Sequence, residues 1–85
     1  MSVPQVHVAT LAEHRLARVS AVRGQALLRE RLVELGFVPG VEVEVLRRAP
    51  FDGPIQVRVR GGTIALRGDE AECVEVEPSP EGAAA

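Results

Sequence analysis

The chain has 85 residues, 46% of them hydrophobic and 26% charged, which is the length and composition of one small globular domain. Ten arginines, no lysines and twelve acidic residues give a formal net charge of −2, which excludes nucleic-acid binding through a strongly basic surface. No apolar stretch approaches the roughly 18 residues of a membrane span, and the start lacks a basic segment followed by an apolar one. We therefore expect a cytoplasmic protein with no nucleic-acid partner and no direct membrane insertion.

The first segment, residues 1–9, alternates only weakly between apolar and polar side chains, so it is either a loose N-terminal arm or a strand added at a sheet edge. Thr10 and Glu13 have the spacing of a capping box, which predicts a short helical turn after Thr10. Leu16–Val22 has small and β-branched residues and is predicted to be a strand that ends before Gly24.

The clearest helix is predicted over Gln25–Leu35, where leucines recur at the spacing of one helical face and charged residues fall on other faces. Gly36 suits the left-handed conformation that ends a helix. The dipeptide Pro39-Gly40 then predicts a turn into the next strand.

Two segments, Val41–Val45 and Gln56–Arg60, alternate valine with polar residues and are predicted to form a hairpin with one buried face. If the valines share a face, directly paired positions have an even sum, and we predict that Arg48 faces Pro54. The same register predicts two cross-strand pairs: Glu44 with Arg58 and Glu42 with Arg60.

The segment after the hairpin is predicted to complete the sheet. Gly61-Gly62 permits a tight reversal into the strand Thr63–Leu66. Asp69–Glu72 is predicted to be one helical turn, and Cys73–Glu77 a closing strand. Five short strands interrupted by one α-helix cannot bury themselves as a flat sheet, so we expect a mainly β fold, a small five-stranded barrel of the SH3 or OB kind with short helical turns.

The last eight residues contain two prolines and a glycine but no large side chain to bury. We therefore expect a flexible tail over residues 78–85. Together with an N-terminal arm over residues 1–9, this leaves a single domain over residues 10–77.

The chain lacks the residue sets on which common enzymes depend. None of its few serines lies in a Gly-x-Ser-x-Gly turn, and a chain without lysine has no phosphate-binding P-loop. Its carboxylates mostly alternate along strands, as expected for a solvated face. We therefore expect no enzyme, no catalytic residue and no bound cofactor.

Four side chains are of the kinds that bind iron or zinc: His7, Glu13, His14 and Cys73. Their spacing matches no metal-binding motif, so we expect no metal site formed by this chain. A domain that binds or senses a transition metal directly remains the alternative function.

Phe51 lies at the tip of the proline-flanked hairpin loop, where it either packs under its own loop or contacts a partner. Phe37, directly after the helix, is predicted to lie in the core. Because the chain has no tryptophan or tyrosine, it lacks the aromatic ridges with which SH3 domains bind proline-rich peptides.

Several segments, in this order and spacing, resemble the FeoA family of bacterial ferrous iron uptake. They are Leu11, Arg31–Gly40, Ala49-Pro50, Pro54-Ile55, Ala65-Leu66-Arg67 and Glu70-Ala71. The resemblance covers about residues 10–77 and implies a small cytosolic SH3-like domain. It also implies an accessory role toward the membrane iron transporter FeoB, whose cytosolic GTPase portion is the expected partner.

With the arginine-bearing rim of the barrel, this resemblance predicts an interface made by Phe51, Asp52, Arg47 and Arg67, with Arg31 next. The loop sequence Phe51-Asp52-Gly53 departs from the Leu-Gly-Asp that is typical of the family. Similar domains also occur at the carboxyl end of iron-dependent repressors. We do not expect a repressor here, because the 85 residues include no DNA-binding segment. A third possibility is weak self-association through an exposed strand edge.

Overall fold

The computed structural model describes residues 6–79. The expectations for residues 1–5 and 80–85 lie outside this part of the chain. The elements in chain order are β1 (Val6–His7), the 3₁₀ helix η1 (Val8–Thr10), β2 (Leu16–Val22), α1 (Ala26–Leu35), β3 (Glu42–Arg48), β4 (Ile55–Val59), β5 (Gly62–Leu66), α2 (Gly68–Glu72) and β6 (Val74–Pro78).

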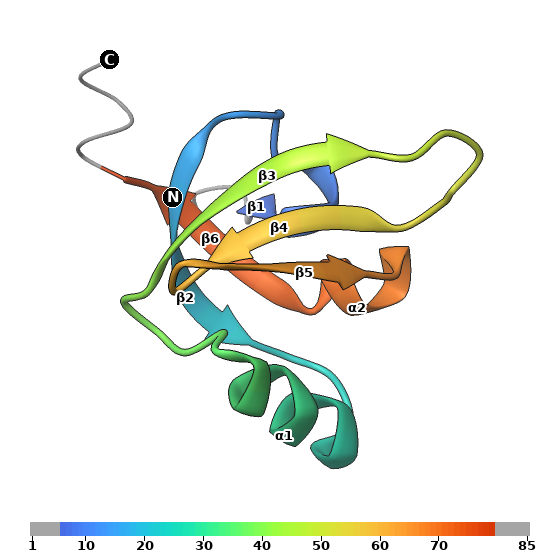
Figure 1. The fold of residues 1–85 in the computed structure, drawn as a ribbon. Coiled ribbons are helices and arrows are strands. Elements are labelled where there is room, and N and C mark those ends of the chain that lie inside the picture. The colour runs from blue at the N-terminus through green and yellow to red at the C-terminus, as the bar shows by residue number, and fades with distance from the viewer. Residues whose placement is uncertain (1–5, 80–85) are drawn as a thin grey trace, which may run out of the picture.

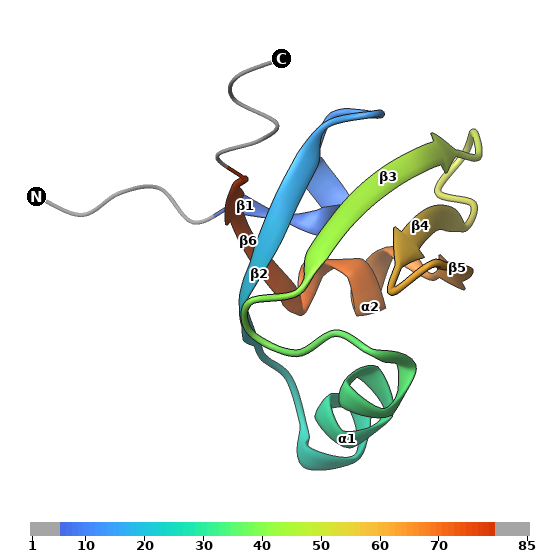
Figure 2. The same ribbon diagram turned by 60° about the vertical axis from the view of Figure 1, so that its left-hand side comes forward.

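The strands form one antiparallel sheet in the order β1-β6-β2-β3-β4-β5. The sheet curls around a core, and α1 projects from one end of the molecule (Figures 1 and 2). The mainly β class is confirmed, and all five predicted strands are present. A sixth strand, β1, pairs with β6 through Val6 and His7, so this part of the first segment is an edge strand and not a loose arm.

The core is built from the inward-facing residues of the sheet and closed by a few residues from the helices. Phe37 is fully buried, as predicted, and Leu32 is the one fully buried residue that α1 contributes. Burying each such side chain contributes roughly 1.5 to 3 kcal/mol, so the core is the main source of stability. Its members are Val8, Leu11, Ala17, Val19, Leu32, Phe37, Val43, Val45, Ile55, Val57, Val59, Leu66, Ala71, Val74 and Val76.

The end of α1 is set by Gly36, which has a left-handed φ of 115°. Its N–H and that of Phe37 bond to carbonyls of the last helical turn, which satisfies groups that the helix end would leave unpaired. Predicted and observed helices agree to within one residue. Neither helix within residues 6–79 is long and apolar enough to cross a lipid bilayer.

The capping box predicted at Thr10 is wrong. The short helix η1 ends at Thr10 and does not follow it, and the Thr10 hydroxyl donates to the His7 carbonyl at 3.1 Å. Glu13 instead accepts the Arg48 N–H at 3.0 Å through its Oε2 atom. Thr10 thus bonds within its own turn, and Glu13 bonds to a strand that is distant in the sequence.

The hairpin of β3 and β4 has the predicted register over its first half only. Glu44 faces Arg58, with 3.2 Å between Oε1 and Nη1. The register then shifts by one residue between Val45 and Arg47, which places a β-bulge at Leu46. The sequence-based parity rule assumed a regular ladder and could not include this extra residue.

Two predicted pairings are wrong as a consequence. Arg48 pairs with Ile55, not with Pro54, because it lies beyond the bulge. Arg60 lies in a turn after the end of β4, so it does not pair with Glu42. The Glu42 carboxylate instead accepts a hydrogen bond from the Ser79 hydroxyl at 2.8 Å.

The turn between β4 and β5 is also shifted by one residue from the prediction. Val59 pairs with Gly62, so the two loop residues are Arg60 and Gly61. Both have positive φ, 53° and 79°, which defines a type I′ turn. Gly62, predicted in the turn, is the first residue of β5.

The bulge turns the Arg48 side chain toward the N-terminal segment. Its Nη1 donates to the Ala9 carbonyl at 2.6 Å, and its Nη2 donates to the carbonyls of Val8, at 3.0 Å, and of Leu11. These carbonyls belong to η1 and the residue after it, so one guanidinium satisfies the end of this short helix. Arg48 thus joins the hairpin to the N-terminal segment, an interaction we call the Arg48 clamp.

At the C-terminal end of the described chain, Pro78 and Ser79 are held against the sheet. Pro78 is the last residue of β6 and pairs with Ala17. Ser79 is buried, and its N–H donates to the Leu16 carbonyl at 3.3 Å. These two residues of the expected tail thus contact the core structure.

The contribution of the Arg48 clamp to the free energy of unfolding can be measured by substitution. Arg48→Leu is expected to lower the free energy of unfolding by about 2 to 4 kcal/mol, because three carbonyls lose a charged donor in a partly buried place. Arg47→Leu is the matched control, since Arg47 is exposed and should change stability by no more than about 0.5 kcal/mol. Urea denaturation followed by circular dichroism measures both. Equal effects of the two substitutions would contradict the clamp.

Candidate protein-binding site

The tip of the β3–β4 hairpin is a tight turn made by residues 50–53. The Gly53 N–H donates to the Pro50 carbonyl at 3.1 Å. Between them, Phe51 and Asp52 have φ of 57° and 60°, both in the left-handed region. Such a pair is typical of glycine, asparagine and aspartate, so Phe51 held there costs on the order of 1 kcal/mol or more. The turn is therefore strained at Phe51.

Phe51 is 99% exposed at this tip. Of its two predicted roles, packing under its own loop is therefore wrong. An exposed aromatic ring on a strained turn has no role in the core and is typical of a residue that contacts a partner.

Close packing at the base of the loop keeps the tip in this conformation. The Ala49 N–H donates to the Pro54 carbonyl at 3.1 Å. A Cβ atom at Gly53 would lie 2.6 Å from the Cβ of Ala49, so no larger residue fits there without a shift of the chain. The loop is thus built as a rigid support for Phe51.

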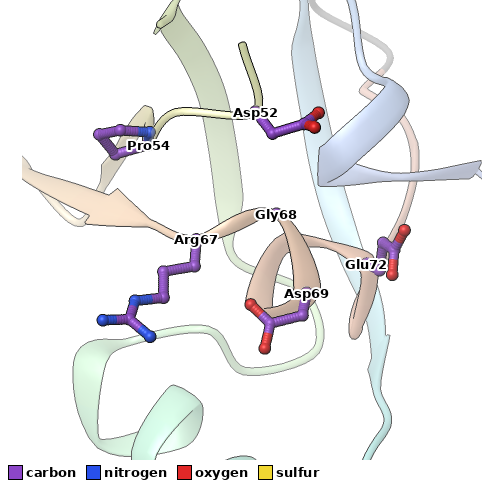
Figure 3. A pocket seen from close by; sticks show the side chains of 6 residues that line it. All are labelled: Asp52, Pro54, Arg67, Gly68, Asp69 and Glu72. Carbon is purple, nitrogen blue, oxygen red and sulfur yellow. The ribbon is translucent and has the colours of Figure 1, made fainter.

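An open groove runs between this loop and α2 (Figure 3). Asp52 and Arg67 lie on opposite sides of it, and the Arg67 side chain extends away from Asp52 toward α1. Asp69 and Glu72 add two carboxylates from α2, so the wall formed by α2 is acidic. The groove is lined by Asp52, Pro54, Arg67, Gly68, Asp69 and Glu72.

Arg31 is connected to this region through Glu70. The Arg31 Nη1 atom lies 3.4 Å from Oε2 of Glu70, while Oε1 accepts the Arg67 N–H at 2.8 Å. Glu70 is only 7% exposed, so its carboxylate is a buried junction between α1 and the start of α2. The Arg31 side chain is 67% exposed and is still accessible to a partner.

Arg47 lies apart from the groove. It pairs with Gln56 across the hairpin and is exposed on the outer face of the sheet. The structure therefore places Asp52 and Arg67 on opposite sides of one groove. Phe51 adjoins Asp52 at the loop tip, and Arg31 is linked to Arg67 through Glu70.

Three acidic residues of α2 were not among the site residues predicted from the sequence. Asp69 and Glu72 belong to a helical turn whose position was predicted, but not its orientation toward the loop. Glu70 lies three residues after Arg67, the spacing of a helix cap, and this spacing could have indicated its role.

The four candidate metal ligands lie in separate places. Glu13 accepts the Arg48 N–H, and His14 Nδ1 lies 3.6 Å from Glu44 Oε2 on the exposed face of the sheet. Cys73 donates its thiol hydrogen to the Asp69 carbonyl at 3.4 Å, and the Nδ1 atom of His7 is buried. Across residues 6–79, no three histidine, cysteine or acidic side chains are placed to hold a metal ion.

The surroundings of Cys73 also disfavour metal binding through its thiolate. Burial raises the pKa of the Cys73 thiol, and the nearby charges of Asp69, Glu72 and Glu70 raise this pKa further. A raised pKa keeps the thiol protonated to higher pH, and the thiolate is the form that binds metals and attacks electrophiles.

A curled antiparallel β-sheet with few helical residues is the architecture of a small SH3-like domain. Residues 6–78 match the family model described as the FeoA domain. The chain therefore belongs to the FeoA family.

Proteins of similar sequence and structure support this assignment. The chain is 34% identical over 61 residues to a fusion of Fe(2+) transport protein A with the Fe(2+) transporter FeoB from Porphyromonas gingivalis, covering 72% of this chain and 7% of that protein. The solution structure of iron(II) transport protein A from Clostridium thermocellum has a TM-score of 0.81 at 36% identity, covering 86% of this chain and 45% of the other. The crystal structure of the zinc complex of Stenotrophomonas maltophilia FeoA, described as a prokaryotic SH3 domain protein, has a TM-score of 0.75 at 34% identity, covering 85% and 89%.

The raised pKa of the Cys73 thiol should slow its alkylation. At pH 8 Cys73 is expected to react with iodoacetamide several-fold more slowly than an exposed thiol, because less thiolate is present. The reaction rate should then rise with pH to a midpoint above that of the same chain unfolded in urea. Stopped samples analysed by mass spectrometry give both rates, and an equal or lower midpoint in the folded chain would contradict the prediction.

Proposed function

We propose that this chain is an accessory protein of bacterial ferrous iron uptake that binds the cytosolic GTPase portion of a FeoB-type transporter. The observation that carries the proposal is the relative in which a FeoA-type segment and the FeoB transporter are one polypeptide. Covalent fusion keeps two domains at a high effective concentration, which is of use when the two act together. This chain spans 7% of that relative, so the transporter activity belongs to the other part of the fusion.

The binding surface we propose consists of Phe51, Asp52 and Arg67, with Arg31 and Arg47 at its margins. Phe51 is the central apolar anchor, because aromatic residues dominate the energy of many interfaces. The strained turn holds it in place before a partner arrives, so little conformational entropy is lost on binding. The exposed guanidinium groups can form paired hydrogen bonds with carboxylates of the transporter.

The proposed action is regulation by contact, without a reaction catalysed by this chain. The β-sheet supplies a rigid support, and the groove beside the loop places carboxylates and a guanidinium at the edge of the interface. A bound domain of this kind can change GTP hydrolysis or assembly of the transporter by favouring one of its conformations.

The central role of Phe51 is tested by truncating its side chain. Phe51→Ala is expected to weaken binding to a full-length FeoB-type transporter in lipid nanodiscs by about 30-fold or more, the effect of removing an aromatic anchor worth about 2 kcal/mol. Biolayer interferometry with the immobilised chain gives the dissociation constants. Because Phe51 is fully exposed, the substitution leaves the fold unchanged.

Leu27→Ala is the matched control. Leu27 is 82% exposed on α1, away from the loop, so its truncation removes a similar amount of apolar surface without touching the proposed interface. An equal loss of affinity for both variants would place the interface elsewhere. Absence of binding by the wild-type chain would remove the proposed function.

A further inference from the structure

The last strand of the sheet, β5, has a free edge. Val59 and Gly62 close the two-residue turn as a hydrogen-bonded pair, and such pairs alternate along an antiparallel ladder. Every second residue from Gly62 therefore bonds to β4. The N–H and C=O groups of the two residues between, Thr63 and Ala65, point away from the sheet.

Nothing in the described part of the chain covers these four backbone groups. No hydrogen bond outside the β4–β5 ladder reaches Thr63 or Ala65 within residues 6–79, and both residues are exposed. Beyond Leu66 the edge is closed, because the Arg67 N–H bonds to Glu70 and its carbonyl accepts the Ala71 N–H at 2.9 Å. The free edge is thus short and has defined ends.

This edge also lacks the usual protection against pairing with another strand. Natural sheets block their edges with charged residues, proline or bulges. Gly62–Leu66 contains neither a charged residue nor a proline, and its pairing with β4 is regular. Thr63 and Ala65 have small side chains that leave the backbone accessible. The edge is therefore suited to bind one further extended segment.

The charges at the two ends of β5 indicate what kind of segment fits. Arg60 precedes the strand and Arg67 follows it, and neither guanidinium has an ion-pair partner among residues 6–79. Of the acidic groups near Arg67, Glu70 is engaged by Arg31, and Asp69 faces the groove. Of the acidic groups that line a second groove with Arg60, Glu42 accepts the Ser79 hydroxyl and Glu44 pairs with Arg58. Arg60 lies in the turn and Arg67 follows the strand, so the extended chain between them is β5 itself, whose 5 residues span about 17 Å.

We propose that the β5 edge binds an extended segment of a partner protein by strand addition, with acidic residues of that segment meeting Arg60 and Arg67. Backbone groups of Thr63 and Ala65 supply the main-chain hydrogen bonds, and the two arginines supply the preference for acidic ends. This site concerns the strand edge alone and does not depend on the partner being a FeoB-type transporter.

The charges disfavour a second copy of this chain as the occupant. Antiparallel pairing of two β5 edges satisfies all four groups when Thr63 of one copy faces Ala65 of the other. This register brings Arg67 of each copy beside Gly61 and Arg60 of the other. Like charges placed across adjoining strands are destabilising, so the edge favours an acidic segment over itself.

The test uses the full chain labelled with ¹⁵N and a synthetic peptide probe. The probe has a core of alternating threonine and valine with the 5-residue length of β5 and a glutamate at each end. A second probe replaces both glutamates with lysine. The amide signals of Thr63 and Ala65 are expected to shift on titration with the acidic probe. The lysine probe is expected to bind about tenfold or more weakly, since two exposed ion pairs become repulsive.

Two variants of the edge sharpen the result. Ala65→Pro removes one outward N–H without removing a bond to β4, and it is expected to weaken binding at least about tenfold. Ala65→Val keeps the N–H and should bind as the wild type does. If Ala65→Pro fails to fold, the double variant Arg60→Glu with Arg67→Glu replaces it, with Arg29→Glu on α1 as the control for a change of charge.

Four outcomes overturn the proposal. The first is no binding of the acidic probe at millimolar concentration. The second is equal binding of both probes, and the third is amide shifts confined to the Phe51 loop. The fourth is a mass that increases with concentration in light scattering and returns to that of a monomer in Ala65→Pro, which would assign the edge to a second copy.

Discussion

The position of the β3–β4 hairpin tip depends on the Arg48 clamp. A bulge at Leu46 turns the Arg48 side chain inward, and its guanidinium bonds to three carbonyls of the N-terminal segment. Glu13 adds a bond from the same segment to the Arg48 backbone. Ladder hydrogen bonds alone would leave the tip of the hairpin free to twist. Here the hairpin is also bonded to the N-terminal segment, just before the strained turn that carries Phe51.

Two parts of the surface, the hairpin tip and the free edge of β5, are suited to different kinds of proposed contact. At the hairpin tip, an exposed aromatic ring and an adjoining charged groove suit the side chains of a folded partner. At the free edge of β5, backbone groups and two flanking arginines suit an extended segment. Arg67 belongs to both places, because it ends β5 and lines the groove. The two proposed contacts therefore share Arg67.

Much of the fold could be predicted because it follows local patterns. Alternating valines located the strands, and the leucine spacing with Gly36 located α1 and its end. The register beyond Val45 could not be predicted, since a bulge adds one residue without leaving a clear mark in the sequence. Arg47 and Arg48 are neighbours of the same type, and only the bulge decides which is exposed and which forms the clamp. The exposure of Phe51 likewise required the conformation of the turn.

We propose that this chain binds a FeoB-type transporter through the rigid hairpin tip. Hydrogen–deuterium exchange of the chain, alone and with the full-length transporter in nanodiscs, shows which residues become protected in the complex. Protection on binding is expected to be concentrated in peptides covering residues 49–54 and 67–72, and to be small over β2 and β6. Protection centred on β2 and β6, with residues 49–54 unchanged in a formed complex, would contradict it.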